Sequence, residues 1–181
     1  NPSHVNVGVL SSKCYHMSII NKYIPELAII LSGGALVSAW IFEYGFGYLP
    51  CTMCHWQRYA HMFVIFIAVL MFLMRRYKNY YTHYMNIFLI FAFVVSSILA
   101  FWHTGVEFSW WDGPETCSTG SQNYDFDINN PLKGLDGMIR PPACSEAVWH
   151  FLGLSMAAWN TLISLTGVLM ATLATRRDLE K

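Results

Sequence analysis

The sequence predicts an all-α membrane protein, a bundle of four transmembrane helices, from two observations. The chain of 181 residues is 55% hydrophobic and only 12% charged, whereas soluble domains carry about 25% charged residues. Four long segments also contain no Asp, Glu, Lys or Arg, namely 27–42, 59–74, 79–106 and 147–175. A soluble all-α core is the alternative, but these segments leave too little polar surface for it. The net charge of zero offers no basic surface to nucleic acid.

These segments define four expected helices in a single integral membrane domain, 1–181. We expect helices at about 25–44, 55–74, 82–106 and 145–174, with external redox loops at 45–54 and 107–144. A spanning helix needs about 20 mostly apolar residues, which the last two segments supply directly. The first two segments are too short on their own and reach the required length only with their flanking residues. Glu26 can lie at the N-terminus of the first helix, and Arg58 can snorkel or be buried near the start of the second.

Two finer patterns concern packing and the long loop. Small residues at Gly33, Gly34, Ser38 and in the pair 96–97 permit close approach between helices in lipid, and a functional role for them is equally open. Within the second external loop, the segment 131–139 mixes apolar and charged residues. This mixture predicts a short amphipathic helix lying on the membrane.

The basic residues set the expected orientation. Eight of the eleven Lys and Arg fall on one side of the bundle, which the positive-inside rule assigns to the cytoplasm. They are Lys13, Lys22, Arg75, Arg76, Lys78, Arg176, Arg177 and Lys181. Both termini then lie inside, and the cysteine-bearing loops lie outside. We expect a multi-pass protein of the bacterial inner membrane with these loops in the periplasm, or alternatively of the mitochondrial inner membrane.

Four of the five cysteines fall on the expected outer side: Cys51, Cys54, Cys117 and Cys144. This even set suggests two pairs, and disulfides persist in such an oxidising compartment. The first two have the Cys-x-x-Cys spacing of redox-active pairs. A zinc site is disfavoured because the other two are far apart in sequence, so no metal is expected. A purely structural staple of the long loop remains open. Cys14, on the reducing side, is expected to be a free thiol.

Cys54 and Arg58 are expected to form the reactive centre. They are four residues apart and share one face of a helix that starts near Cys54. The helix N-terminus and the guanidinium both stabilise a thiolate, so we expect a lowered pKa at Cys54. Arg58, close to the membrane interface, needs a partner, and a thiolate with a polar ligand headgroup would provide one.

A disulfide beside a membrane-embedded cation needs an electron acceptor, and a lipid-soluble quinone is the natural one. It resides in the bilayer, accepts two electrons and has carbonyl oxygens that Arg58 can hydrogen-bond. Each 30 mV of potential difference is worth about 1.4 kcal/mol for a two-electron couple. A quinone can therefore oxidise even a strongly oxidising dithiol.

These motifs together resemble the DsbB family of four-helix disulfide:quinone oxidoreductases in the bacterial inner membrane. The resemblance covers about 25–174. It rests on Cys51-x-x-Cys54-x-x-x-Arg58, on TrpHisThrGlyValGlu at 102–107, on the isolated Cys117, and on CSEAVWHFLGLSMAAW at 144–159. Gln57 stands where the family often has a carboxylate, which leaves open any proton-handling role of that position.

The resemblance implies a role for each of these residues. Cys117 and Cys144 would form the disulfide that a soluble DsbA-like thioredoxin-fold oxidase attacks at Cys117. Cys144 would pass electrons towards Cys51, and Cys54 would form a charge-transfer complex or adduct with the quinone, ubiquinone or menaquinone. Arg58 would assist, and His103 would lie near the quinone headgroup; an interfacial histidine at a helix end is the equally open alternative.

Other functions stay open at this stage. Vitamin K epoxide reductase-like proteins also combine a quinone, a Cys-x-x-Cys motif and a helical bundle, but their redox Cys-x-x-Cys normally lies late in the chain. A haem-binding subunit could use two of the histidines near the outer face, which are His55, His61, His103 and His150. A non-catalytic subunit of a larger, organellar membrane complex could keep the disulfides as staples.

Overall fold

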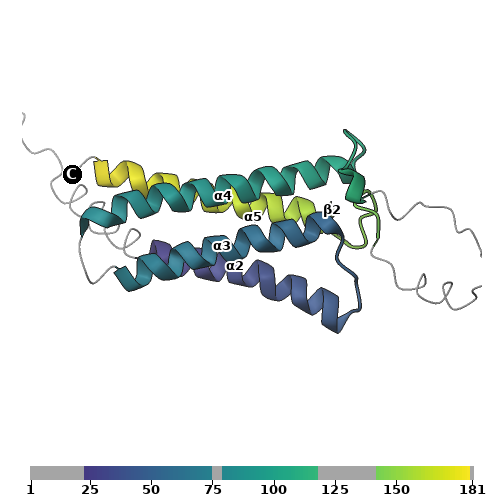
Figure 1. The fold of residues 1–181 in the computed structure, drawn as a ribbon, viewed down its shortest axis with the longest axis horizontal. Helices are drawn as coiled ribbons and strands as arrows, with labels where there is room; N and C mark the ends of the chain where they lie inside the picture. Colours follow the sequence, from purple (N-terminus) through teal and green to yellow (C-terminus); the bar gives the residue numbers. More distant parts are fainter. Residues whose placement is uncertain (1–22, 75–78, 118–141, 180–181) are drawn as a thin grey trace, which may run out of the picture.

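The computed structural model describes residues 23–74, 79–117 and 142–179, which form a bundle of long helices (Figure 1). The elements are α2 (Ile24–Trp40), the π-helical turn η1 (Ile41–Gly45), α3 (Thr52–Met74), α4 (Asn79–Glu107), β1 (His150–Phe151), β2 (Leu154–Ser155) and α5 (Met156–Leu179). Four stretches in the described residues are long and apolar enough to cross a membrane: Ile24–Gly45, Thr52–Met74, Tyr84–Glu107 and Met156–Arg176. The predicted four-helix membrane fold is confirmed.

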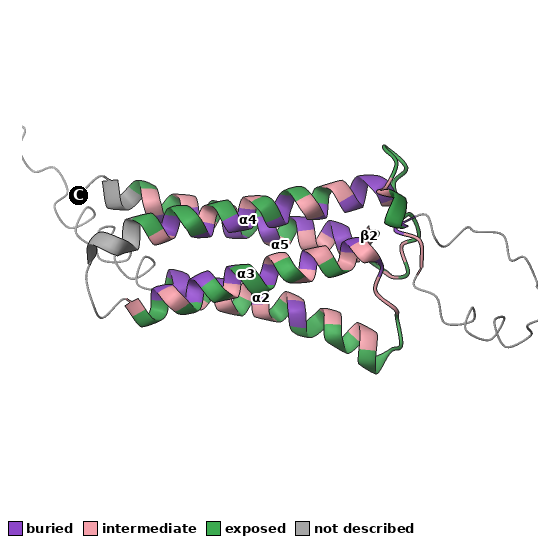
Figure 2. Ribbon diagram, viewed as in Figure 1, coloured by how far each residue is buried: buried purple, intermediate pink, exposed green. Residues whose placement is uncertain are grey.

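The helices pack around a narrow apolar core. α4 packs along α5 and α3, and α2 packs along α3, whereas α2 and α5 touch much less. Val64, Leu89 and Phe93 are among the fully buried core side chains. The outward faces are exposed, as Figure 2 shows, and they carry large apolar residues such as Ile30 and Phe66. Apolar side chains on the outside are what a lipid-facing surface requires.

Close contacts between α4 and α5 use small and hydroxyl-bearing residues. The Ser96 and Ser164 hydroxyls are 2.9 Å apart in the core. A Cβ added to Gly167 would lie 2.4 Å from the Phe93 ring, so only glycine fits there. The packing role considered for Ser96 is confirmed. For Gly33 and Gly34 it is not, because nothing lies within 4 Å of a Cβ built on either.

Three helices begin three or more residues away from the expected position, and one of them is α4, which begins at Asn79 instead of 82. α3 begins at Thr52 instead of 55, so the loop before it ends before Cys54. α5 begins at Met156 instead of 145, because β1 and β2 form an antiparallel hairpin before it. The hairpin turn is Leu152-Gly153, with φ of 53° and 79°, which matches the two-residue type I′ turn that joins short strands.

The start of α5 is fixed by Ser155. Its hydroxyl oxygen accepts a 3.2 Å hydrogen bond from the Ala158 N–H, which is a standard N-terminal cap. The Ser155 hydroxyl in turn donates to the Glu107 carboxylate at the end of α4. The hairpin and the cap therefore tie the start of α5 to the same end of the bundle as the start of α3.

Several expectations fall outside the described residues. They are the amphipathic helix at 131–139, Cys14, the placement of both termini, and most of the basic residues that define the inner side. The inside–outside orientation remains a prediction.

Candidate active site

Cys51, Cys54, Cys117 and Cys144 gather in one buried cluster. Cys51, Cys117 and Cys144 are buried there with other apolar residues, and Cys54 packs against them. Cys117 and Cys144 form a disulfide with a Cα–Cα distance of 5.2 Å. Cys51 and Cys54 are free thiols whose sulfurs lie 2.9 Å apart. The two pairs expected from the sequence therefore form, and they lie next to each other.

The sulfur of Cys51 caps the N-terminus of α3. It accepts a 3.3 Å hydrogen bond from the backbone N–H of Cys54, in the geometry that an N-cap hydroxyl usually adopts. The Cys54 thiol hydrogen bond lowers the pKa of Cys51; burial opposes this, and His103 and the Cys54 N–H reinforce it. The expectation was therefore wrong about the residue, because the lowered pKa is found at Cys51 and its main cause is the hydrogen bond with the Cys54 thiol.

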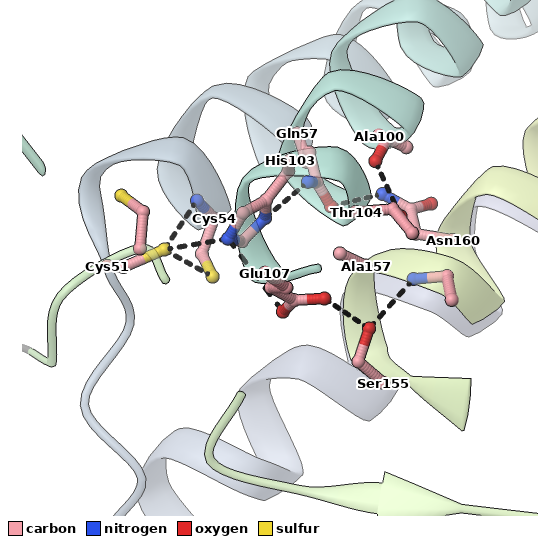
Figure 3. Close-up of polar contacts among 12 residues, drawn as sticks. Cys51, Cys54, Gln57, Ala100, His103, Thr104, Glu107, Ser155, Ala157 and Asn160 are labelled. Carbon is pink, nitrogen blue, oxygen red and sulfur yellow. Dashed lines mark hydrogen bonds and ion pairs between the residues drawn. The ribbon is translucent and has the colours of Figure 1, made fainter. Parts of the chain in front are cut away.

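His103 connects the thiols to α4. Its Nε2 lies 3.5 Å from the Cys51 sulfur and 3.9 Å from Glu107 Oε1. Its Nδ1 lies 2.8 Å from Gln57 Nε2, as Figure 3 shows. His103 was expected near a quinone headgroup, and in the structure its ring contacts the Cys51 sulfur. Since both ring nitrogens already have protein partners, haem ligation by His103 would break these hydrogen bonds.

Arg58 has a partner that the sequence analysis missed. Its guanidinium forms an ion pair with the Glu43 carboxylate and donates to the Ala39 carbonyl at 3.3 Å. The two charged side chains are 12% and 18% exposed. The signal was present, because Glu43 is the only acidic residue between Glu26 and Glu107. A thiolate is therefore not needed to neutralise Arg58.

A cavity of about 520 Å³ lies between α2, α3 and α5. Its few polar or reactive side chains include Cys54, Gln57, Arg58, His61 and Asn160, and most of the rest of its wall is apolar. Ligand pockets typically have volumes of about 300 to 1,000 Å³, with an apolar wall and a few polar groups that orient the ligand. This donor set fits a quinone, with an apolar space for ring and tail and hydrogen-bond donors for the oxygens.

The predicted site residues divide between two neighbouring spaces. Cys54 and Arg58 line the large cavity. Cys51 and His103 line an adjoining space of about 40 Å³, in whose wall Cys54 also takes part. Cys54 therefore lines both spaces. This position suits a residue that connects the Cys51 thiol with a ligand in the large cavity.

A metal is the competing occupant of the thiol site. The sulfurs of Cys51 and Cys54 and a ring nitrogen of His103 lie within 4.8 Å of one another, a donor set that zinc also accepts. The four-cysteine zinc site considered above is not formed, because the Cys117–Cys144 disulfide removes two of its ligands.

A chain of polar side chains that was not expected from the sequence lies inside the bundle. Asn160 Nδ2 donates to Gln57 Oε1 at 2.6 Å, and Asn160 Oδ1 lies 2.6 Å from His61 Nε2 (Asn160 and Gln57 are labelled in Figure 3). Asn160 lies on α5 and the other two residues lie on α3. Nothing in the spacing indicates that these positions face one another.

Fold and site together define a four-helix membrane protein with two adjacent cysteine pairs at one end. The family described as disulfide bond formation protein DsbB matches residues 21–174. The chain belongs to this family, and it is a multi-pass membrane oxidoreductase of disulfide bond formation.

Two of the relatives bear the name of this family. The chain is 31% identical over 137 residues to a disulfide bond formation protein B of a Polaromonas species, covering 72% of this chain and 79% of the relative. It is 33% identical over 138 residues to the protein of the same name from Polaromonas naphthalenivorans, covering 72% and 80%. It is also 25% identical over 162 residues to an uncharacterized protein of Rickettsia prowazekii, covering 89% of each chain.

Proposed function

We propose that this protein is a membrane dithiol:quinone oxidoreductase. It reoxidises a periplasmic DsbA-like thioredoxin-fold oxidase and passes the electrons through its two cysteine pairs to ubiquinone or menaquinone. One observation carries this proposal: both pairs share a buried cluster, and Cys54 also lines an apolar cavity between transmembrane helices.

The outer pair exchanges with the soluble partner. A thiolate of the reduced partner attacks Cys117, which forms a mixed disulfide and releases the Cys144 thiolate. The partner's second thiol then displaces Cys117, so the partner leaves oxidised and Cys117 and Cys144 remain as a dithiol. Cys117 suits this attack better than Cys144, because it is 8% exposed and Cys144 is 1% exposed.

The two pairs then exchange electrons by thiol–disulfide chemistry. The Cys144 thiolate attacks Cys51 of a Cys51–Cys54 disulfide and releases Cys54. Cys117 next attacks Cys144, which restores the outer disulfide and releases Cys51. The lowered pKa of Cys51 makes it a good leaving group in this last step.

The inner dithiol is reoxidised at the cavity. A bound quinone supplies the oxidising power by accepting two electrons and two protons, the number that Cys51 and Cys54 lose when they close their disulfide. Arg58 provides hydrogen-bond donors for a ring oxygen, and its ion pair with Glu43 holds the guanidinium at the cavity wall. His103 orients the Cys51 sulfur.

The test is an anaerobic titration of the purified full-length protein with a reduced DsbA-like partner and a short-chain ubiquinone, following quinone absorbance. We expect one quinone to be reduced per partner dithiol, and Cys54→Ser to abolish the reaction. Cys14→Ser serves as the matched thiol control and should react like the wild type. Equal rates for the wild type and Cys54→Ser would reject the proposed function.

A further inference from the structure

His61 has a buried nitrogen without a partner beside the large cavity. The side chain is 2% exposed and lines that cavity. Its Nε2 lies 2.6 Å from Asn160 Oδ1, whereas its Nδ1 has no hydrogen-bond partner among the described residues. Buried polar atoms are nearly always hydrogen-bonded, so an unpartnered one beside a cavity points to a ligand.

The neighbouring amides determine which nitrogen of His61 carries the proton. Asn160 uses Nδ2 to donate to Gln57 Oε1, so its Oδ1 is the atom that faces His61 and can only accept. Nε2 of His61 must therefore be the N–H donor. In a neutral imidazole the other nitrogen, Nδ1, then carries a lone pair and no hydrogen.

The same polarity continues to the thiols. Gln57 Nε2 can only donate, so His103 Nδ1 accepts and His103 Nε2 carries the hydrogen that faces the Cys51 sulfur. Every hydrogen bond in the chain His61–Asn160–Gln57–His103–Cys51 thus points from the cavity towards the thiol. The two amides do not relay protons. They hold both rings in fixed tautomers.

An unpartnered acceptor on a residue that lines the cavity distinguishes the two redox states of a quinone ring. A quinol presents O–H groups, which Nδ1 can accept, whereas a quinone presents carbonyl oxygens, whose lone pairs would face the lone pair of Nδ1. Such a site binds the reduced ring better than the oxidised ring, which favours reduction of the bound quinone.

We propose that His61, oriented by Asn160, accepts a hydrogen bond through Nδ1 from the ring hydroxyl of the quinol and so selects the reduced ring. This role rests on the quinone reduction proposed above. His61 touches the ligand, whereas Asn160 is a positioning residue that acts through His61.

The experiment measures binding separately from turnover. A Cys51→Ser/Cys54→Ser background of the full-length protein cannot react, so quinone and quinol can both be titrated as stable ligands. Trp149 and Trp159 line the same cavity, and their fluorescence reports occupancy by a short-chain ubiquinone or its quinol. We expect His61→Leu to weaken quinol binding about tenfold, the size of one hydrogen bond, and to change quinone binding by less than about threefold.

Two further variants complete the design. His55→Leu makes the same chemical change on an exposed residue of α3 that does not line the cavity, and it should alter neither affinity. Asn160→Leu frees the His61 tautomer and should reduce the preference for quinol over quinone. It also carries the test if His61→Leu does not fold.

The outcomes separate this role from the proposed enzyme activity. Equal loss of both affinities in His61→Leu, or no loss of either, overturns the His61 proposal. An unchanged ligand preference in Asn160→Leu overturns it as well. If the Cys51→Ser/Cys54→Ser background prefers quinol through His61 but the wild type never oxidises a dithiol, the enzyme activity alone is rejected.

Discussion

A cysteine sulfur occupies the N-cap position of α3, where serine or aspartate is usual. Sulfur is a weak hydrogen-bond acceptor as a thiol and a much better one as a thiolate. The backbone N–H of Cys54 and the positive end of the helix therefore favour the ionised form of Cys51. The resting dithiol is thus asymmetric, with the charge on the sulfur closer to His103.

This asymmetry predicts a pH dependence for Cys51. In a Cys14→Ser background, Cys54→Ser keeps a hydroxyl donor to the Cys51 sulfur, whereas Cys54→Ala removes it. Because donors stabilise the thiolate, the pKa of Cys51 should be higher in the alanine variant. Thiolate ultraviolet absorbance, titrated from acid to alkaline pH, measures this. Identical titration midpoints would show that the Cys54 side chain does not set the pKa.

The Arg58–Glu43 ion pair predicts a separation of stability from function. Arg58→Met leaves a largely buried carboxylate alone, and Glu43→Leu leaves a largely buried guanidinium alone, so each should destabilise the bundle by about 1 to 3 kcal/mol. The double variant removes both charges and should recover most of this loss. Thermal unfolding of the wild type, the two single variants and the double variant in detergent measures these changes in stability.

The double variant should nevertheless bind quinone weakly, because the proposed donor to the ring is gone. If it binds quinone as tightly as the wild type, the role of Arg58 is structural only. If the single variants are as stable as the wild type, the pair contributes nothing to the fold.

At the scale of elements, the packing of α4 against α5 depends on one missing side chain. Gly167→Ala places a Cβ against the Phe93 ring, and the clash should lower the free energy of unfolding by about 1 to 3 kcal/mol. Gly33→Ala is the matched control, since nothing lies near its Cβ and the better helix former should be neutral or stabilising. Gly167→Ala should therefore lower the thermal unfolding temperature and Gly33→Ala should not, and equal effects would contradict this account of the contact.

Hydropathy was sufficient to predict the four helices, because lipid requires long apolar segments with internally satisfied backbones. It was not sufficient for the first residues of α3 and α5. Cysteine is an uncommon cap, so nothing marked Thr52 as the first residue of α3. The Leu152-Gly153 turn contains one residue that rarely adopts positive φ, so the hairpin was read as helix.

The site could be predicted from the sequence where its residues lie close together in the chain. Cys51, Cys54 and Arg58 belong to one spacing motif, and the structure places Cys54 and Arg58 on one cavity. The pairing of Arg58 with Glu43, and of His61 with Asn160, joins different helices. Such pairs depend on how the helices are rotated about their axes, which composition and spacing do not determine.

At the scale of the whole molecule, the outer disulfide closes a separation of 27 residues between α4 and α5. Closing a loop of this length contributes about 3 to 4 kcal/mol in the chain-entropy model. We expect the Cys117→Ser/Cys144→Ser variant to lose thermal stability and to lose turnover with the protein partner.

The same variant should still reduce quinone when a small dithiol replaces the partner, because the inner pair and the cavity are intact. Anaerobic quinone absorbance with each electron donor measures the difference. Loss of both activities would mean that the Cys117–Cys144 disulfide is needed mainly for the stability of the fold and not for electron transfer.

All of the reactive groups lie at one end of the bundle, where α3 and α5 start and α4 ends. Dithiol oxidation releases as many protons as quinone reduction consumes, and neither electrons nor protons have to travel along the helices. Turnover would therefore be electroneutral across the bilayer. In sealed vesicles the reaction should proceed at the same speed whether or not a voltage is imposed.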